Sequence, residues 1–179
     1  MHNTFLFGRI YTSFEGIRCT YKRVIANAKK EITMSKVKIK IIFLGHIPYE
    51  INKEKIVRKK SDLFQIIGPI GTYNIVGNSD GPEWDFTDEN IQKQLPKRDS
   101  EDVLLAITNV ALQDRYYVRG YNDNKVCLTF NTMAEILKSD NIPLENLIFR
   151  ILYFISLAYK LYGNRMPTIA EAKSFIHDE

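Results

Sequence analysis

The segment Leu144–Tyr162 reads LENLIFRILYFISLAYKLY, and it contains nine consecutive uncharged residues between Arg150 and Lys160. Apolar side chains point in nearly every helical direction, which predicts a helix buried in a protein interior or a membrane. A bilayer span needs roughly 20 predominantly apolar residues, and Glu145, Arg150 and Lys160 interrupt this run. We therefore expect a long core helix that ends near Gly163, since glycine readily adopts the left-handed conformation after a helix.

Strand patterns elsewhere predict a sheet that packs on this helix. The segment Val37–Leu44 alternates lysine with apolar residues and then becomes continuously apolar, whereas Val103–Thr108 is apolar throughout and should be central. Arg115–Tyr121 and Lys125–Phe130 flank Asn122-Asp123-Asn124, a composition typical of a β-hairpin turn. The predicted fold class is α+β, with a mixed sheet of about four to five strands on a long buried helix, and a β-hairpin.

Shorter elements are predicted from helix-start and turn residues. Thr87 precedes a helical segment, DENIQKQL, and the glycine- and proline-rich stretch before it predicts turns around a strand at Thr72–Val76. Thr132 with Glu135 forms a capping-box pattern that predicts a helix over Met133–Lys138. A similar pattern, Thr168 with Glu171, predicts a terminal helix over residues 169–176.

Composition and charge place the chain among soluble globular proteins. Of its 179 residues, 45% are hydrophobic, and its two cysteines lie far apart at positions 19 and 127. We expect a reducing, cytoplasmic environment without a secretion signal. Residues 1–33 hold six basic and two acidic side chains, which accounts for the whole net charge of +4. The predicted organisation is a basic N-terminal arm or extension at 1–33 and a single α+β domain at 34–179.

Two features of the termini bear on this division. Met34-Ser35-Lys36, directly before the first strong strand, resembles an alternative translation start. If translation begins there, the arm would be an extension that the fold does not require. The chain stops abruptly at His177-Asp178-Glu179, which indicates a processed or truncated end.

The first functional hypothesis is a non-catalytic interaction subunit of a multi-protein complex. Tyrosine and arginine dominate the residues that carry binding energy at protein interfaces, and both gather on the first strand of the hairpin. Side chains alternate across a strand, so Arg115, Tyr117 and Arg119 should share one face. A solvated polar face is the alternative explanation. The predicted partner-binding residues are Arg115, Tyr117, Arg119 and Tyr121.

The second hypothesis is a nucleic-acid-binding module, in which basic and aromatic residues of the arm act with a basic patch of the body. Such binding would depend steeply on salt. The patch is otherwise a solvated face of a weakly amphipathic segment. The candidate residues are Arg18, Lys22, Arg23, Lys29, Lys30, Lys53, Lys55, Arg58, Lys59 and Lys60.

The third hypothesis is a metal-dependent hydrolase. His46 and His177 with a carboxylate would suit zinc, although nothing in the sequence brings them together. An acidic cluster could hold a divalent cation, but its spacing does not match a calcium loop, and carboxylates at a helix start have an ordinary role. That cluster comprises Asp80, Glu83, Asp85, Asp88 and Glu89. Cys127 in an apolar strand is expected to be inert packing. We predict no catalytic residue and no cofactor.

The order of elements over residues 102–163 resembles the central part of zincin metallopeptidases, especially the archaemetzincin-like ones. It comprises the strand VLLAIT, the hairpin RYYVRGYNDNKVCLTF, a capped segment and the long helix. Those families carry His-Glu-x-x-His on the helix to bind zinc and activate water. Here the helix offers RILYFISLAYK, without histidine or glutamate. The resemblance therefore implies a degenerate, non-catalytic member, and accessory proteins of bacterial antiphage systems are the context that it implies.

Overall fold

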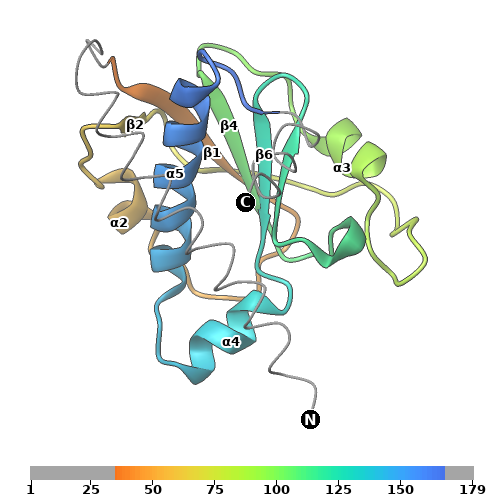
Figure 1. The fold of residues 1–179 in the computed structure, drawn as a ribbon. Helices are drawn as coiled ribbons and strands as arrows, with labels where there is room; N and C mark the ends of the chain where they lie inside the picture. Colours follow the sequence, from red (N-terminus) through yellow and green to blue (C-terminus); the bar gives the residue numbers. More distant parts are fainter. Residues whose placement is uncertain (1–34, 168–179) are drawn as a thin grey trace, which may run out of the picture. The chain divides into compact units, whose positions relative to one another are not determined.

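A computed structural model describes residues 35–167, and residues 36–168 form one compact unit. Its centre is a six-stranded mixed sheet (Figure 1) in which only the last strand runs antiparallel to its neighbour. The strands lie in the order β2 (Phe64–Ile66), β1 (Val37–Leu44), β4 (Val103–Thr108), β6 (Lys125–Thr129) and β5 (Val118–Tyr121), and β3 (Gly71–Tyr73) also pairs with β1. The predicted α+β class with a β-hairpin is confirmed.

The outer neighbour of β1 is a single edge strand that is interrupted. Both β2 and β3 pair in parallel with β1, and the register moves from Val37–Phe64 to Ile42–Gly71. Between these two pairs β1 advances by five residues and the edge segment by seven, so the edge segment contains two extra residues. They fall around Gly68-Pro69, where Gly68 has a φ of 68° and proline has no backbone N–H to donate to a ladder. This interruption explains why the sheet has six strands rather than the predicted four to five.

Helices cover both faces of the sheet. Successive side chains of a strand point to opposite faces, and one set packs with α3 (Asp88–Gln94) in a buried cluster. On the other face lie α5 (Leu144–Leu161) and α2 (Lys53–Val57), which contact each other (Figure 1). The cluster on the α3 face comprises Ile42, Leu44, Phe86, Ile91, Leu95, Leu104, Ala106, Leu112 and Cys127.

The long helix α5 has the predicted position and length. Ile148, Leu152 and Ile155 are fully buried along one side. Two aromatic residues on the other side of the helix, Tyr153 and Phe154, remain partly exposed. Burial is therefore confirmed along one stripe rather than around the whole circumference, because the sheet covers only one side of the helix.

Helix starts agree with the sequence in one case and differ in another. The Thr87 side chain accepts a hydrogen bond from the Asn90 backbone N–H, 3.3 Å, at the start of α3. The predicted capping box at Thr132 is wrong: Thr132 has a φ of 66° and its hydroxyl donates to Asn131 Oδ1, 3.1 Å, instead of capping α4 (Met133–Ser139). The predicted arm at 1–33 and terminal helix at 169–176 lie outside the described residues.

Candidate interaction site

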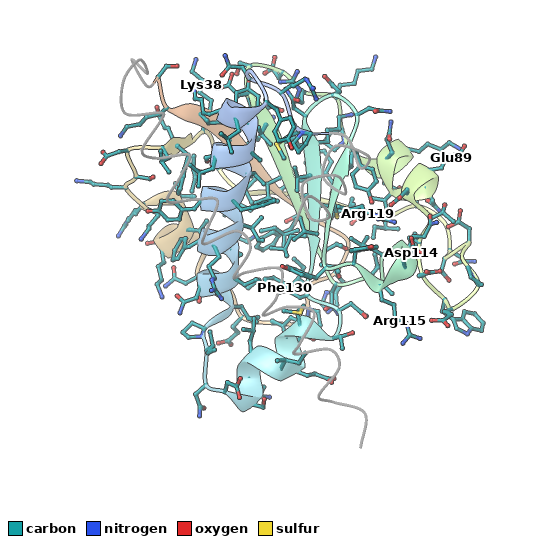
Figure 2. All side chains as sticks on the ribbon, viewed as in Figure 1. Lys38, Glu89, Asp114, Arg115, Arg119 and Phe130 are labelled. Carbon is teal, nitrogen blue, oxygen red and sulfur yellow. The ribbon has the colours of Figure 1, made fainter. Side chains whose placement is uncertain are left out.

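Arg119 of β5 is the centre of a polar network on the α3 side of the sheet. It pairs in register with Cys127 of the buried cluster, so its side chain lies over the same face. Its Nε lies 2.9 Å from Asp88 Oδ1 and one terminal nitrogen lies 3.1 Å from Asp114 Oδ2. Only 8% of the Arg119 side chain is exposed. Figure 2 shows Arg119, Asp114 and Arg115 on the side of the molecule where α3 lies.

Local backbone structure positions the two carboxylates. Asp88 occupies the first turn of α3, directly after the capping residue Thr87. Asp114 lies in a one-turn 3₁₀ segment, η1 (Gln113–Arg115), with a φ of 58°, a conformation that Asn and Asp adopt more easily than most residues. Two segments far apart in sequence therefore converge on one guanidinium.

Ionisation in this network is shifted by burial and by neighbouring charge. Burial of Arg119 opposes its charged form, but the hydrogen bonds and charges of Asp88 and Asp114 prevail and raise its pKa. The Tyr121 hydroxyl donates to Asp88 Oδ1, 3.3 Å, and burial, reinforced by neighbouring negative charge, raises the pKa of Tyr121. Arg119 is thus a permanently charged anchor inside the protein.

Backbone hydrogen bonds hold residue 86 against residues 111–113. Phe86 and Leu112 form a parallel bridge, the Phe86 N–H donates to the Ala111 carbonyl, 2.9 Å, and the Gln113 N–H donates to the Phe86 carbonyl, 3.0 Å. The Gln113 side chain accepts from the Asp88 N–H, 3.0 Å. These bonds place the two loops side by side, so their exposed residues belong to one region of the surface.

That region carries three exposed residues of the types found at interface hot spots: Trp84, Arg115 and Tyr116. We call these three residues the Trp84 surface. Trp84 is 87% exposed, whereas Arg115 forms an ion pair with Glu83. The Tyr116 ring lies 4.6 Å from the Arg119 guanidinium. Tyr116 of the Trp84 surface therefore packs on Arg119, whose charge is paired with Asp88 and Asp114.

The four predicted partner-binding residues do not share one exposed face. Arg115 is exposed, Arg119 is buried, and Tyr117 and Tyr121 are half-buried. Burial raises the pKa of Tyr117, and the charge of Arg150 opposes this shift. The predicted alternation from Arg115 is wrong because β5 begins only at Val118 and the preceding residues form η1.

Trp84 was missed by reasoning from strand periodicity. It lies in the turn sequence GPEWD and is the one tryptophan of the whole chain. An isolated aromatic residue in a turn-rich loop belongs to no apolar period. Its rarity and its polar neighbours were the signal that could have identified it as a surface residue.

The basic residues of the nucleic-acid hypothesis are divided between two parts of the chain. Arg18, Lys22, Arg23, Lys29 and Lys30 lie outside the described residues. In the body, Arg58 pairs with Glu54, 3.2 Å. Lys53 and Lys59 lie over the Phe43 and Phe149 rings, at 4.6 Å and 4.9 Å. Lys55 and Lys60 are exposed.

Four of the five carboxylates in the acidic cluster have partners within the protein, whereas Asp85 Oδ1 is buried without a hydrogen bond. Asp80 accepts from the Thr87 N–H and hydroxyl, at 3.0 Å and 2.7 Å, which lowers its pKa. Glu89 pairs with Lys93, 2.7 Å. Within residues 35–167 no group of three or more His, Cys, Asp or Glu is arranged to hold a metal ion. His46 is exposed at the end of β1, and its suggested partner His177 lies outside the described range.

Comparison of the chain with protein-family models, curated proteins and solved structures gives no match. No helix within the described part of the chain is long and apolar enough to cross a membrane.

Proposed function

We propose that this chain is a non-catalytic interaction subunit that binds another protein of a bacterial multi-protein complex through the Trp84 surface. The observation that carries the proposal is the 87% exposure of Trp84 beside Arg115 and Tyr116. Tryptophan, tyrosine and arginine are the residue types most enriched among interface hot spots. An antiphage system is the proposed context, on a resemblance to the small accessory proteins of such systems alone.

The fixed base beneath this surface supports the proposal. Binding is weakened when flexible side chains must be ordered, at about 0.5–1.5 kcal/mol for each one. Tyr116 is held over the buried Arg119, whereas the ion pair of Arg115 with Glu83 is exposed to solvent and orders Arg115 little. Part of that ordering is therefore present before a partner arrives, and an apolar pocket on the partner would receive the Trp84 indole.

The test compares variants of the tagged chain during co-purification with the products of neighbouring genes. Trp84→Ala and Tyr116→Ala should each weaken retention of a specific partner, and a hot-spot loss of about 2 kcal/mol corresponds to about a 30-fold rise in Kd. Val76→Ala is the matched control, because Val76 is 76% exposed and lies outside this surface.

A partner retained equally by wild type, Trp84→Ala and Tyr116→Ala would contradict the assignment of this surface. Equal losses for Val76→Ala would contradict it as well, since the contact would then be non-specific adhesion to exposed apolar side chains.

A further inference from the structure

Connections at the carboxyl ends of β1 and β4 leave the sheet in opposite directions. After β1 the chain passes through α2 to β2 and β3 on one side, and after β4 it passes to β5 and β6 on the other side (Figure 1). In sheets with parallel strands, diverging connections open a crevice at the carboxyl ends, and ligands bind there. The topology alone therefore marks one place on this molecule for a small ligand.

Two adjoining hollows occupy this place. Their volumes are about 420 and 390 Å³, and both are lined by Gly45, His46 and Asn74 at the ends of β1 and β3. Such volumes lie within the range of about 300–1,000 Å³ of ligand pockets, but both hollows are broad and open to solvent, so a ligand here would stay partly exposed. Asn109, which follows β4, lines the larger hollow, so all three converging strands contribute to the crevice.

The lining favours an anion. Lys53 and His46 supply basic groups, and among the described residues that line either hollow none is acidic. Lys53 Nζ lies 4.6 Å from the centroid of the Phe43 ring, which places the ammonium at the smaller hollow. A cation would meet no opposite charge here, whereas a phosphate or carboxylate would meet the Lys53 ammonium and a hydrogen-bond donor in the His46 imidazole.

The remaining lining residues suit an aromatic, hydrogen-bonding group attached to the anion. Tyr49 offers aromatic surface in the smaller hollow, whereas Phe43 is buried beneath Lys53. Thr72 and Asn74 offer hydrogen-bonding groups. In the larger hollow, Asn109 adds a further amide side chain to the lining.

We propose that this crevice binds a mononucleotide, with its phosphate near Lys53 and His46 and its base in the aromatic and amide-lined remainder. A mononucleotide combines the charge, the planar ring and the hydrogen-bond donors that the lining complements. The site is separate from the Trp84 surface, and it stands or falls independently of the proposed interaction function.

The test titrates the full chain with AMP, GMP, CMP and UMP by isothermal titration calorimetry and by NMR. At least one mononucleotide should bind, and at least 10-fold more tightly than its nucleoside or inorganic phosphate alone. Amide shifts should concentrate at Gly45, His46, Asn74 and Asn109. Absence of binding by all four at millimolar concentration, or shifts elsewhere, would overturn the proposal. Equal affinity for the nucleoside would overturn the anionic assignment.

A charge-matched pair of variants sharpens the test. Lys53→Met should weaken nucleotide binding at least 10-fold. Lys55→Met removes the same charge two residues away on α2, outside the lining, and should leave the affinity within about 2-fold of wild type. Equally weakened binding in both variants would overturn the site, because the effect would then be general electrostatic attraction rather than contact with Lys53. Circular dichroism and the NMR map of the wild type keep the result decisive if one variant folds poorly.

Discussion

Arg119 and Asp88 form an ion pair, 2.9 Å from Nε to Oδ1, that joins the edge strand β5 to the first turn of α3. The two partners differ in exposure: the Arg119 side chain is 8% exposed and that of Asp88 is 29% exposed. Loss of the carboxylate would leave a buried cation short of one partner, whereas loss of the guanidinium would leave two carboxylates that water can reach. The pair should therefore respond asymmetrically to substitution.

Asp88→Ala should lower the free energy of unfolding by about 2–4 kcal/mol, and Arg119→Met by less. Only the first change leaves a buried charge without one of its partners. Urea unfolding at pH 7 measures both. Glu89→Ala is the matched control, since Glu89 lies in the same helical turn and its pair with Lys93 is exposed; it should cost less than about 0.5 kcal/mol. Equal losses for Asp88→Ala and Glu89→Ala would contradict the role of the buried pair.

Trp84→Gly should leave stability unchanged or raise it by about 0.5–1 kcal/mol. Trp84 has a φ of 61°, which is unfavourable for residues with a Cβ and free for glycine. Tyr116→Gly should instead lower stability by about 1–2 kcal/mol, because Tyr116 has a φ of −71° and stacks on Arg119. Thermal and urea unfolding of both variants check this contrast, and a destabilised Trp84→Gly variant would show that the indole packs in the fold.

Gly45→Ala should be more destabilising than Gly68→Ala, although both glycines have a positive φ, of 77° and 68°. A Cβ at Gly45 would lie 2.9 Å from Ile75 Cδ1, whereas nothing lies within 4 Å of a Cβ at Gly68. We expect about 1–2 kcal/mol for the backbone strain at either site. The further loss at Gly45 should be smaller, because the atom in the way is the mobile end of the Ile75 side chain.

The double variant Gly45→Ala with Ile75→Val isolates the steric part of this loss. Valine lacks the Cδ1 atom, so Ile75→Val should be less destabilising in the Gly45→Ala background than in the wild type. A double-mutant cycle measured by urea unfolding gives the coupling directly. Strict additivity would mean that the loop moves away without cost.

Alkaline pH should destabilise the fold through Cys127. Burial raises the pKa of this thiol to about 12 from its ordinary value of 9.0, and the charge of Asp88 adds to the shift. Because the folded-state pKa is raised, the contribution to stability is complete below pH 9 and is lost as pH rises toward 12. The expected loss is about 1.4 kcal/mol per pH unit within that window.

Unfolding free energies at pH 8, 9.5 and 10.5 check this dependence. Cys127→Ala should flatten the curve, leaving only the contribution of buried tyrosines such as Tyr121, whose pKa is also raised. Identical slopes for wild type and Cys127→Ala would exclude the thiol as a source of the pH dependence.

Sequence alone predicted two strands at the centre of the sheet, Val37–Leu44 and Val103–Thr108, with the boundaries that the structure has. Val103–Thr108 is a continuous apolar run that is buried on both faces, as in parallel sheets. Val37–Leu44 begins with alternating lysines, of which Lys38 is exposed, and becomes fully buried only in its second half. The core helix followed from the same reasoning, with its start at Leu144 and Gly163 beyond its end.

The candidate site was less accessible to such reasoning, because tertiary contacts determine it. Asp114 and Arg115 have φ values of 58° and 56°. The ion pairs of Arg115 with Glu83 and of Arg119 with Asp88 join residues 32 and 31 positions apart. No local pattern encodes those pairings, so the hairpin strand was predicted too long. The crevice depends on strand order, which hydrophobic periodicity does not reveal.

The break between β2 and β3 has a consequence for solubility. An unbroken outer strand would present a continuous row of backbone donors and acceptors onto which a second molecule could build its own strand. Here the row is interrupted at Gly68-Pro69, where the register gains two residues. Each remaining piece spans three residues, too short a template for stable intermolecular pairing. This margin of the sheet should therefore resist amyloid-like stacking even at high protein concentration.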